Sequence, residues 1–148
     1  MPLDPSFAGR DYPPSAPYVV SAAKIAEFAE SIRDTSPVYF DSAAARAAGH
    51  PHVVAPPTFL TIVNLRTIAG IVADPKLGLD WSRVVHAEQR FAHIRPIVAG
   101  DRLVVAATIT DIMARAGNDF LTVRADVSTE AGDPVAVCTA TLVARGTA

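Results

Sequence analysis

The spacing of hydrophobic and polar positions changes near the middle of the chain. In residues 22–33 apolar side chains recur every three or four positions, which is typical of an amphipathic helix, and Ser21 precedes them as a candidate N-cap. Asp41 is the candidate N-cap of a second, alanine-rich helix. Residues 58–73 are apolar on nearly all faces, which indicates a buried helix, and Pro57 fits its first position because proline has no amide to leave unpaired.

Beyond residue 83 the sequence is rich in valine, isoleucine and threonine, which favours strands. Turn residues rich in glycine, proline and asparagine divide this half of the chain into four predicted strands, at residues 83–94, 102–113, 119–129 and 134–145. Residues 1–17 hold many prolines and are predicted to form an irregular arm. Helices followed by an antiparallel meander indicate an α+β fold, with a sheet that curls around the buried helix and covers most of its sides.

Composition narrows the class of protein. A length of 148 residues suits one domain, so we expect residues 1–148 to fold as a single domain. The net charge is −2 and the charges are scattered, which argues against nucleic-acid binding. Cys138 is the single cysteine, so no internal disulfide forms. The start of the chain lacks the pattern of a signal peptide, and no apolar stretch is long enough for a membrane span, so we expect a cytoplasmic protein.

Three segments resemble the MaoC-like family of (R)-specific hydratases and dehydratases, especially its short actinobacterial members related to the non-catalytic subunit of the mycobacterial (3R)-hydroxyacyl-ACP dehydratase. Residues 34–41, DTSPVYFD, are similar to the family signature D-x-N-P-[LIV]-H-x-D. Residues 49–59, which end in APPTF, are similar to the loop that leads into the central helix. Residues 86–103, HAEQRFAHIRPIVAGDRL, are similar to the family stretch H-x-E-Q-x-F…RP…AGD.

The resemblance implies the hot-dog fold, in which a long central helix is wrapped by a curved antiparallel sheet, and it implies that two hot dogs pair. It also implies an acyl thioester substrate, carried on CoA or on acyl-carrier protein, and reversible water addition between a trans-2-enoyl and an (R)-3-hydroxyacyl thioester. In active members an aspartate and a histidine bind the water and transfer the proton, and a backbone amide polarises the thioester carbonyl. No cofactor is implied.

The catalytic signature is incomplete in this chain. Asp34 matches the family aspartate, Ser36 replaces the signature asparagine, and Tyr39 stands where active members have the histidine. An ordinary tyrosine has a pKa of about 10, against about 6.5 for histidine, so it is a poor general base near neutral pH. Asp34 also suits a simple capping or turn role, and Tyr39 a packed aromatic one.

The substrate-binding residues implied by the resemblance lie mostly around the central helix. The helix-entrance glycine of the family falls on Pro57, which has no N–H, and an amide of Thr58 or Phe59 is the alternative donor. Ser36 and Asn64 are further candidates for substrate binding. Arg95 is a candidate contact for a phosphate of CoA or of a carrier arm, and a solvated strand end is its simpler interpretation.

The histidines offer a weak catalytic candidate and no metal site. His86 belongs to the third similar segment, where a structural hydrogen bond is the simpler interpretation. His86 and His93 are seven positions apart on one predicted strand, so strict alternation places them on opposite faces. His50 and His52 share a loop, but no further cluster of metal-ligand residues supports them.

Three functions remain open at this stage. The first is a component of an (R)-3-hydroxyacyl thioester dehydratase, active only with a catalytic hot-dog partner. The second is a homodimeric protein that binds an acyl thioester without transforming it. The third is a self-sufficient hydratase or thioesterase that uses Asp34 with an unconventional partner such as His86.

Overall fold

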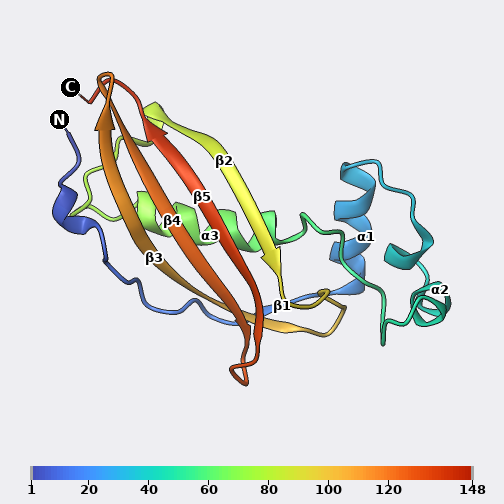
Figure 1. Ribbon diagram of the computed structural model, residues 1–148. Coiled ribbons are helices and arrows are strands. Elements are labelled where there is room, and N and C mark those ends of the chain that lie inside the picture. The colour runs from blue at the N-terminus through green and yellow to red at the C-terminus, as the bar shows by residue number, and fades with distance from the viewer. Residues whose placement is uncertain (1, 148) are drawn as a thin grey trace.

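Five antiparallel strands form one curved sheet, and helix α3 (Leu60–Val72) lies across its concave face (Figure 1). The computed structural model describes residues 2–147. The strands are β1 (Tyr18–Val19), β2 (Val84–His93), β3 (Arg102–Arg115), β4 (Asn118–Thr129) and β5 (Pro134–Ala144), in the spatial order β1-β3-β4-β5-β2. A helix lying across a curved antiparallel sheet is the arrangement that the hot-dog resemblance predicts.

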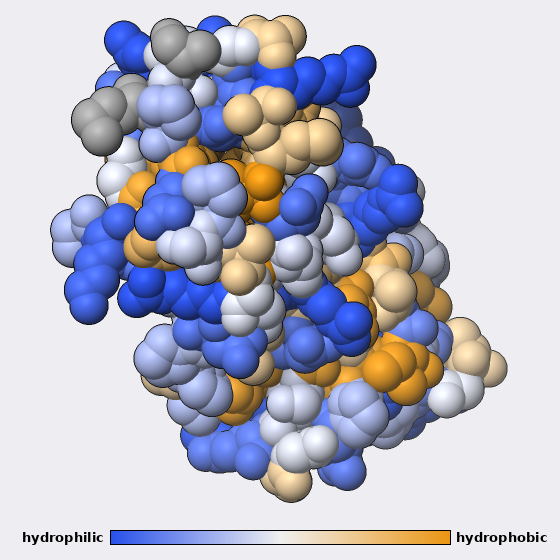
Figure 2. Space-filling view, turned by 60° about the vertical axis from the view of Figure 1, so that its left-hand side comes forward, coloured by the Kyte–Doolittle hydropathy of each residue, from blue (hydrophilic) through white to orange (hydrophobic). Residues whose placement is uncertain are grey.

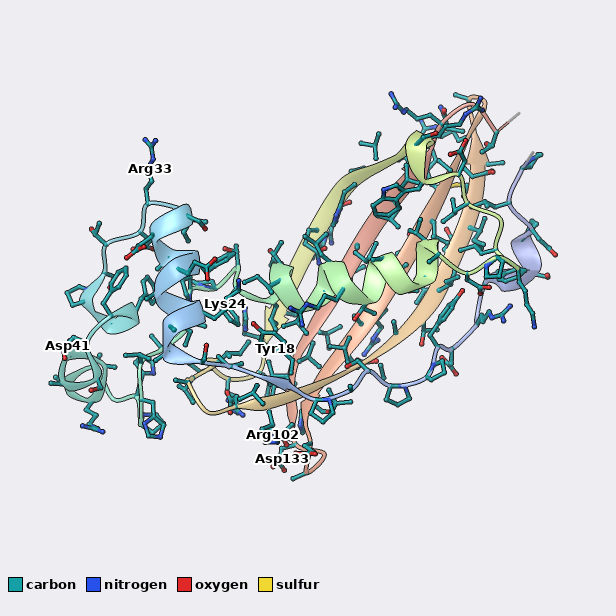
Figure 3. All side chains as sticks on the ribbon, turned by 180° about the vertical axis from the view of Figure 1, so that it is seen from behind. Tyr18, Lys24, Arg33, Asp41, Arg102 and Asp133 are labelled. Carbon is teal, nitrogen blue, oxygen red and sulfur yellow. The ribbon has the colours of Figure 1, made fainter. Side chains whose placement is uncertain are left out.

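Two short helices lie beyond one end of the sheet (Figures 1 and 3). They are α1 (Ala22–Ser31) and α2 (Ser42–Ala47), and 3₁₀ turns occupy Pro5–Phe7, Pro37–Tyr39 and Trp81–Arg83. The predicted N-caps of α1 and α2 are confirmed. Ser21 accepts a hydrogen bond from the amide of Lys24 at 3.1 Å, and Asp41 accepts one from the amide of Ala43 at 3.0 Å. Each cap satisfies a backbone donor that the first helical turn leaves without a partner.

The central helix begins later than the sequence pattern predicts. Pro57 was expected at its first position, but residues 57–59 form a turn in which the amide of Phe59 donates to the carbonyl of Pro56 at 2.9 Å. The hydrogen bonds at this entrance join each residue to the third one before it, Phe59 to Pro56 and Thr61 to Thr58, so a tighter turn precedes the regular helix. Phe59 is fully buried and packs edge-on against Phe28, with 5.6 Å between ring centroids.

The sheet covers one face of α3 rather than most of its sides. The face toward the sheet is buried, with Leu60, Val63, Asn64, Ile68, Ile71 and Val72. The opposite face is exposed, and its Leu65 keeps 46% of its surface accessible. The expectation that the curled sheet encloses the helix is therefore wrong for the single chain, because five strands bend only part of the way around.

Alternation and bulges together explain the curved sheet. Along β4, residues at every second position face α3 and are buried, and β3 and β5 follow the same pattern. The pairing register shifts between His86 and Glu88 in β2 and between Ile109 and Asp111 in β3. Such bulges insert an extra residue and bend the strand that holds it, so the sheet curves around the helix.

The two edges of the sheet differ. The proline-rich arm runs along the outer edge of β3, where the amides of Gly9, Tyr12 and Ser15 donate to carbonyls of β3 at 2.7–2.9 Å. Leu3 is buried at the end of this arm, and its amide donates to the buried carboxylate of Asp119 at 2.7 Å. The other edge is β2, which no described segment pairs on its outer side and whose side chains are mostly exposed.

The face of the molecule in Figure 2 shows hydrophobic residues in scattered patches among hydrophilic ones. None of the described helices is long and apolar enough to cross a membrane.

Candidate functional site

A cavity of about 420 Å³ opens where the helical segment meets the end of β2. We call it the site pocket. The 3₁₀ turn Pro37–Tyr39, the loop before α3 and the segment after β2 form its walls. Most lining residues are apolar, and the polar ones are Tyr39, His50, His93 and Arg95. A largely apolar pocket with a few convergent polar groups is the usual form of a small-molecule site.

Asp34 and Tyr39 lie close together beside this pocket. Arg33 adopts a positive φ of 58°, which ends α1 and turns the chain, and the Asp34 carboxylate then accepts the amide of Ser36 at 3.1 Å. The pKa of Tyr39 is raised, first by burial and then by the charge of the Asp34 carboxylate and a hydrogen bond to it. The Tyr39 hydroxyl therefore stays protonated near neutral pH, and it can donate a hydrogen bond but is a poor proton acceptor.

The entrance of the central helix offers the amide of Thr58 as a free donor. Pro57 lines the site pocket but has no N–H. The amide of Phe59 is already bonded to Pro56, whereas within residues 2–147 no acceptor pairs with the amide of Thr58. The side chain of Thr58 is exposed, and Phe59 belongs to the hydrophobic core. Of the two alternative donors, only Thr58 is unoccupied.

His93 is a pocket residue that the sequence did not single out. Its Nε2 lies 2.7 Å from the carbonyl oxygen of Pro57. Because a carbonyl only accepts, Nε2 must carry the proton in this bond. The available signal was its position inside residues 86–103, the segment that resembles the family.

The prediction that His86 and His93 occupy opposite faces is wrong. His86 pairs with Leu142 and His93 with Ala136, and both of these β5 residues are buried on the side that faces α3. Directly paired residues share a face, so the bulge after His86 shifts both histidines to one side. They remain about 20 Å apart along the strand, too far to share a metal ion. His86 is exposed and lies outside the site pocket.

Within residues 2–147 no three histidine, cysteine, aspartate or glutamate side chains are grouped closely enough to hold a metal ion.

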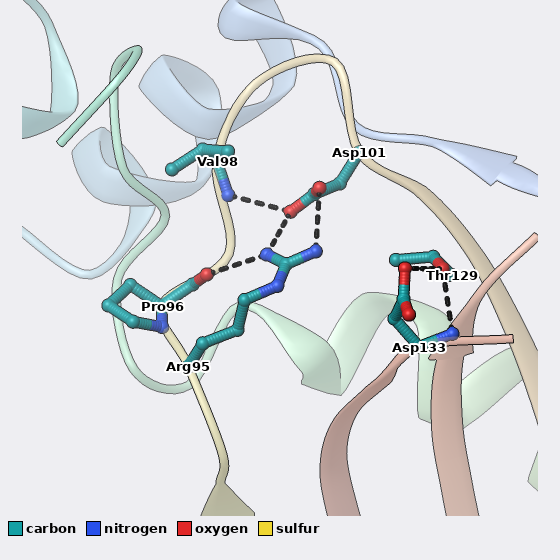
Figure 4. Close-up of polar contacts among 6 residues, drawn as sticks. All are labelled: Arg95, Pro96, Val98, Asp101, Thr129 and Asp133. Carbon is teal, nitrogen blue, oxygen red and sulfur yellow. Dashed lines mark hydrogen bonds and ion pairs between the residues drawn. The ribbon is translucent and has the colours of Figure 1, made fainter. Parts of the chain in front are cut away.

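Arg95 lines the pocket, but its guanidinium is held by Asp101 (Figure 4). Its Nη1 and Nη2 donate to the two carboxylate oxygens at 2.8 and 3.0 Å, and Nη1 also donates to the carbonyl of Pro96 at 2.9 Å. The amide of Val98 donates to the same carboxylate at 3.0 Å. The hydrogen bond to Asp101 raises the pKa of Arg95. A phosphate at Arg95 would have to compete with Asp101, so this pair stabilises the loop more readily than it binds an anion.

Asn64 lies deeper along α3 and outside the pocket lining. It is 3% exposed, and its Nδ2 donates to Oε1 of Gln89 on β2 at 2.8 Å. Ser36 joins the site only through its amide, which Asp34 accepts. The predicted site residues thus form a cluster of Asp34, Ser36, Tyr39 and Pro57, with the amide of Thr58 beside it.

Chemically, the pocket combines an apolar wall with a protonated phenol, a nearby carboxylate and a histidine bonded to the backbone. It can hold an acyl group and donate hydrogen bonds to it. The family position of the general base is filled by a hydroxyl that burial and Asp34 both keep protonated.

Comparison with known proteins places this chain among dehydratase-like proteins. It matches the protein family described as FAS1-like, dehydratase domain region, over residues 6–138. A UPF0336 protein of Saccharopolyspora erythraea is 59% identical over 148 residues, covering 100% of this chain and 95% of that one. A UPF0336 protein of Streptomyces coelicolor is 51% identical over 145 residues, covering 98% of this chain and 97% of that one.

Two solved structures share the fold. One, described as a MaoC-like dehydratase, is 32% identical with a TM-score of 0.87 over 95% of this chain, which spans 42% of that protein. The C-terminally truncated HadBC (3R-hydroxyacyl-ACP dehydratase) complex of Mycobacterium tuberculosis is 27% identical with a TM-score of 0.84, covering 97% of this chain and 99% of that one. The chain therefore belongs to the FAS1-like dehydratase-region family, as a MaoC-like hot-dog protein.

Proposed function

We propose that this protein is the acyl-binding component of an (R)-3-hydroxyacyl thioester dehydratase and depends on a catalytic hot-dog partner. The observation that carries the proposal is Tyr39, which occupies the family histidine position beside Asp34 and whose raised pKa keeps it protonated. Pro57 weakens the site further, because it offers no amide at the helix entrance. The apolar site pocket suits an acyl thioester on CoA or on acyl-carrier protein.

A partner is proposed because β2 leaves an unpaired edge. Strand edges of this length usually pair with another chain or are protected. The similarity to the HadBC complex supports pairing between two different chains, whereas a homodimer would serve a protein that only binds. We place the chemistry on the partner, with this chain supporting the acyl group.

The test is hydration of crotonyl-CoA and longer enoyl-CoAs by this protein alone and together with a hot-dog protein that has an intact D-x-N-P-x-H signature. We expect negligible turnover alone and robust turnover by the pair. A positioned acid/base pair contributes about 10²–10⁴-fold in rate. The hydration rate of the pair should therefore exceed that of this protein alone by about 10²-fold or more. Robust turnover by this chain alone would overturn the proposal.

A restoration series examines the same site directly. The triple variant Ser36→Asn, Tyr39→His and Pro57→Gly returns the signature histidine and asparagine and a helix-entrance amide. We expect partial recovery of hydration by the triple variant and none from single changes, because groups that act on one transition state are not additive. A well-folded triple variant without activity would indicate that more of the site than these three positions has been lost.

One observation favours a second candidate, a self-sufficient hydratase or thioesterase. His93 lines the pocket with Tyr39, and its bond to Pro57 leaves Nδ1 as a proton acceptor in the neutral ring. His93→Ala should abolish turnover of enoyl-CoA or acyl-CoA by the isolated protein if this candidate is correct. If the parent protein and His93→Ala both show only background turnover, the result supports the partner-dependent function.

A further inference from the structure

A second cavity, of about 520 Å³, adjoins the site pocket. Its walls are residues 49–51, in the loop after α2, and the segment between β2 and β3. His50, Arg95 and Pro96 line the site pocket as well, and we call these residues the shared wall. Because both cavities are open to the surface, a ligand can extend from one into the other over the shared wall without passing through the core.

The guanidinium of the shared wall is neutralised within the chain. The terminal nitrogens of Arg95 donate to the two carboxylate oxygens of Asp101 at 2.8 and 3.0 Å (Figure 4). The carboxylate is itself held in place, because it accepts the amide of Val98 at 3.0 Å and its side chain is only 12% exposed. A phosphate at this wall would meet the Asp101 carboxylate beside the guanidinium, so the wall favours an uncharged part of a ligand.

His50 is the residue of the shared wall that keeps hydrogen-bonding capacity for a ligand. Gly49 ends α2 with a positive φ of 93°, and the amide of His50 then donates to the carbonyl of Ala45 at 2.9 Å. The loop backbone is thus satisfied without the imidazole, which is half-buried and, unlike that of His93, has no hydrogen-bond partner within residues 2–147. A neutral imidazole offers one donor and one acceptor, which suits an amide group of a ligand.

We propose that the second cavity binds the uncharged, amide-bearing arm that joins a thioester to its carrier, and that His50 recognises this arm by hydrogen bonding. The inference rests on the proposed acyl-binding function, which places the acyl group in the site pocket. CoA and acyl-carrier protein both present the thioester on such an arm, with its phosphate at the far end. The phosphate then adds little to binding, because Asp101 already occupies the guanidinium of Arg95.

The test compares three saturated ligands by calorimetry, with the protein alone and in the assembled pair. They are octanoyl-CoA, octanoyl-pantetheine, which lacks the phosphates and the nucleotide, and S-ethyl octanethioate, which lacks the arm. None of them can be hydrated, so the measurement needs no catalysis. Octanoyl-pantetheine should bind within about threefold of octanoyl-CoA, and S-ethyl octanethioate at least about tenfold more weakly, because it loses the hydrogen bonds of the arm. A larger advantage of octanoyl-CoA, or equal affinity of all three ligands, overturns the inference.

Variants locate the recognition at His50. His50→Ala should weaken octanoyl-pantetheine about tenfold and S-ethyl octanethioate less than about twofold. His50→Gln keeps a donor and an acceptor and should stay within about threefold of the parent. If His50→Ala does not fold, His50→Phe replaces it, because phenylalanine fills the space of the ring without hydrogen-bonding.

The matched control is His52→Ala, because His52 is exposed in the same loop and lines neither cavity. It should leave the affinity for each ligand unchanged. Equal losses in His50→Ala and His52→Ala overturn the role of His50. Absence of binding by the parent protein for all three ligands overturns the proposed acyl-binding function, and this inference falls with it.

Discussion

The two edges of the sheet are built in opposite ways. Along β3 the proline-rich arm supplies backbone donors, and its end is anchored by Leu3 bonded to the buried Asp119. Along the outer side of β2 no strand within residues 2–147 pairs with the backbone, and polar side chains such as Glu88 and Arg90 are exposed. An exposed strand edge invites pairing, whereas a covered edge prevents it. The difference teaches that the chain closes one edge with its own residues and leaves the other open, which is where we propose that a partner pairs.

Removing the N-terminal arm that covers the β3 edge should have the largest effect on stability. Deleting residues 2–17 exposes β3, removes the burial of Leu3 and leaves the Asp119 carboxylate without its amide donor. We expect the free energy of unfolding to fall by about 4 kcal/mol. The melting temperature should fall by about 10–15 °C. Circular dichroism measures the melting, and light scattering should detect association through the newly exposed edge. Pro14→Ala, at an exposed arm position, is the control and should melt like the parent.

A change on the outer edge of β2, which we call the bare edge, should chiefly weaken association with a partner chain. Arg90→Glu places a second negative charge beside Glu88 on the exposed β2 strand, and Arg90→Ala, which removes the positive charge without adding a negative one, is the matched control. We expect Arg90→Glu to weaken association about tenfold in sedimentation equilibrium, and Arg90→Ala by less than threefold. Equal association of both variants would place the interface elsewhere.

The attachment of the arm should show a distinct pH dependence. The Tyr12 hydroxyl donates to Asp74 at 2.9 Å, and burial, followed by the bond to Asp74, raises the pKa of Tyr12 to about 12. Because the folded-state pKa lies above the ordinary value of about 10, the stabilisation is complete below pH 10 and is lost as the pH rises toward 12. Tyr12→Phe should lower the free energy of unfolding by about 1 kcal/mol at neutral pH.

Tyr12→Phe should also remove this part of the alkaline loss of stability, measured by urea unfolding between pH 8 and about pH 11.5. Tyr18→Phe, whose ring lies under Arg66, is the control and should keep the alkaline loss. An alkaline loss that persists unchanged in Tyr12→Phe would show that the arm is not held through this hydroxyl.

The smallest effect is expected at the site itself, if the bare edge recruits a catalytic partner. In the assembled pair, Asp34→Asn in this chain should change hydration of enoyl-CoA by less than threefold. The corresponding change in the partner should cost about 10²–10⁴-fold, the usual contribution of a general acid or base. A large loss from Asp34→Asn would assign chemistry to this chain and would remove the proposed division of labour.

Local features of the fold were predictable from the sequence. Ser21 and Asp41 cap their helices as expected, because capping depends on a few neighbouring residues. The bounds of the four predicted strands agree within two positions, since alternation of apolar residues is a local signal. The start of α3 was misplaced because a turn with three-residue hydrogen bonds, Phe59 to Pro56 and Thr61 to Thr58, leads into the helix, and the apolar pattern of the segment does not record it.

The candidate site was only partly predictable. Family resemblance identified Asp34 and Tyr39, and the structure places the two side chains near each other. His93 was missed, because its place in the pocket depends on the loop of Pro57, 36 residues earlier in the chain. Arg95 was a candidate contact for a phosphate, with a solvated strand end as the simpler interpretation, yet Asp101 binds its guanidinium. The sequence alone does not indicate which partner a guanidinium binds.

The sequence by itself determined the order of helices and strands, the caps, and the loss of the signature histidine and of an amide at Pro57, since these depend on residue identity and short-range spacing. The tertiary structure alone decided three other features: the bulge that puts His86 and His93 on one face, the arm that closes the β3 edge, and the hydrogen bond that joins Asn64 to Gln89. Each of these depends on which distant segments pair and in what register. A one-residue shift in a strand reverses the direction of its side chains, and no local pattern records such a shift.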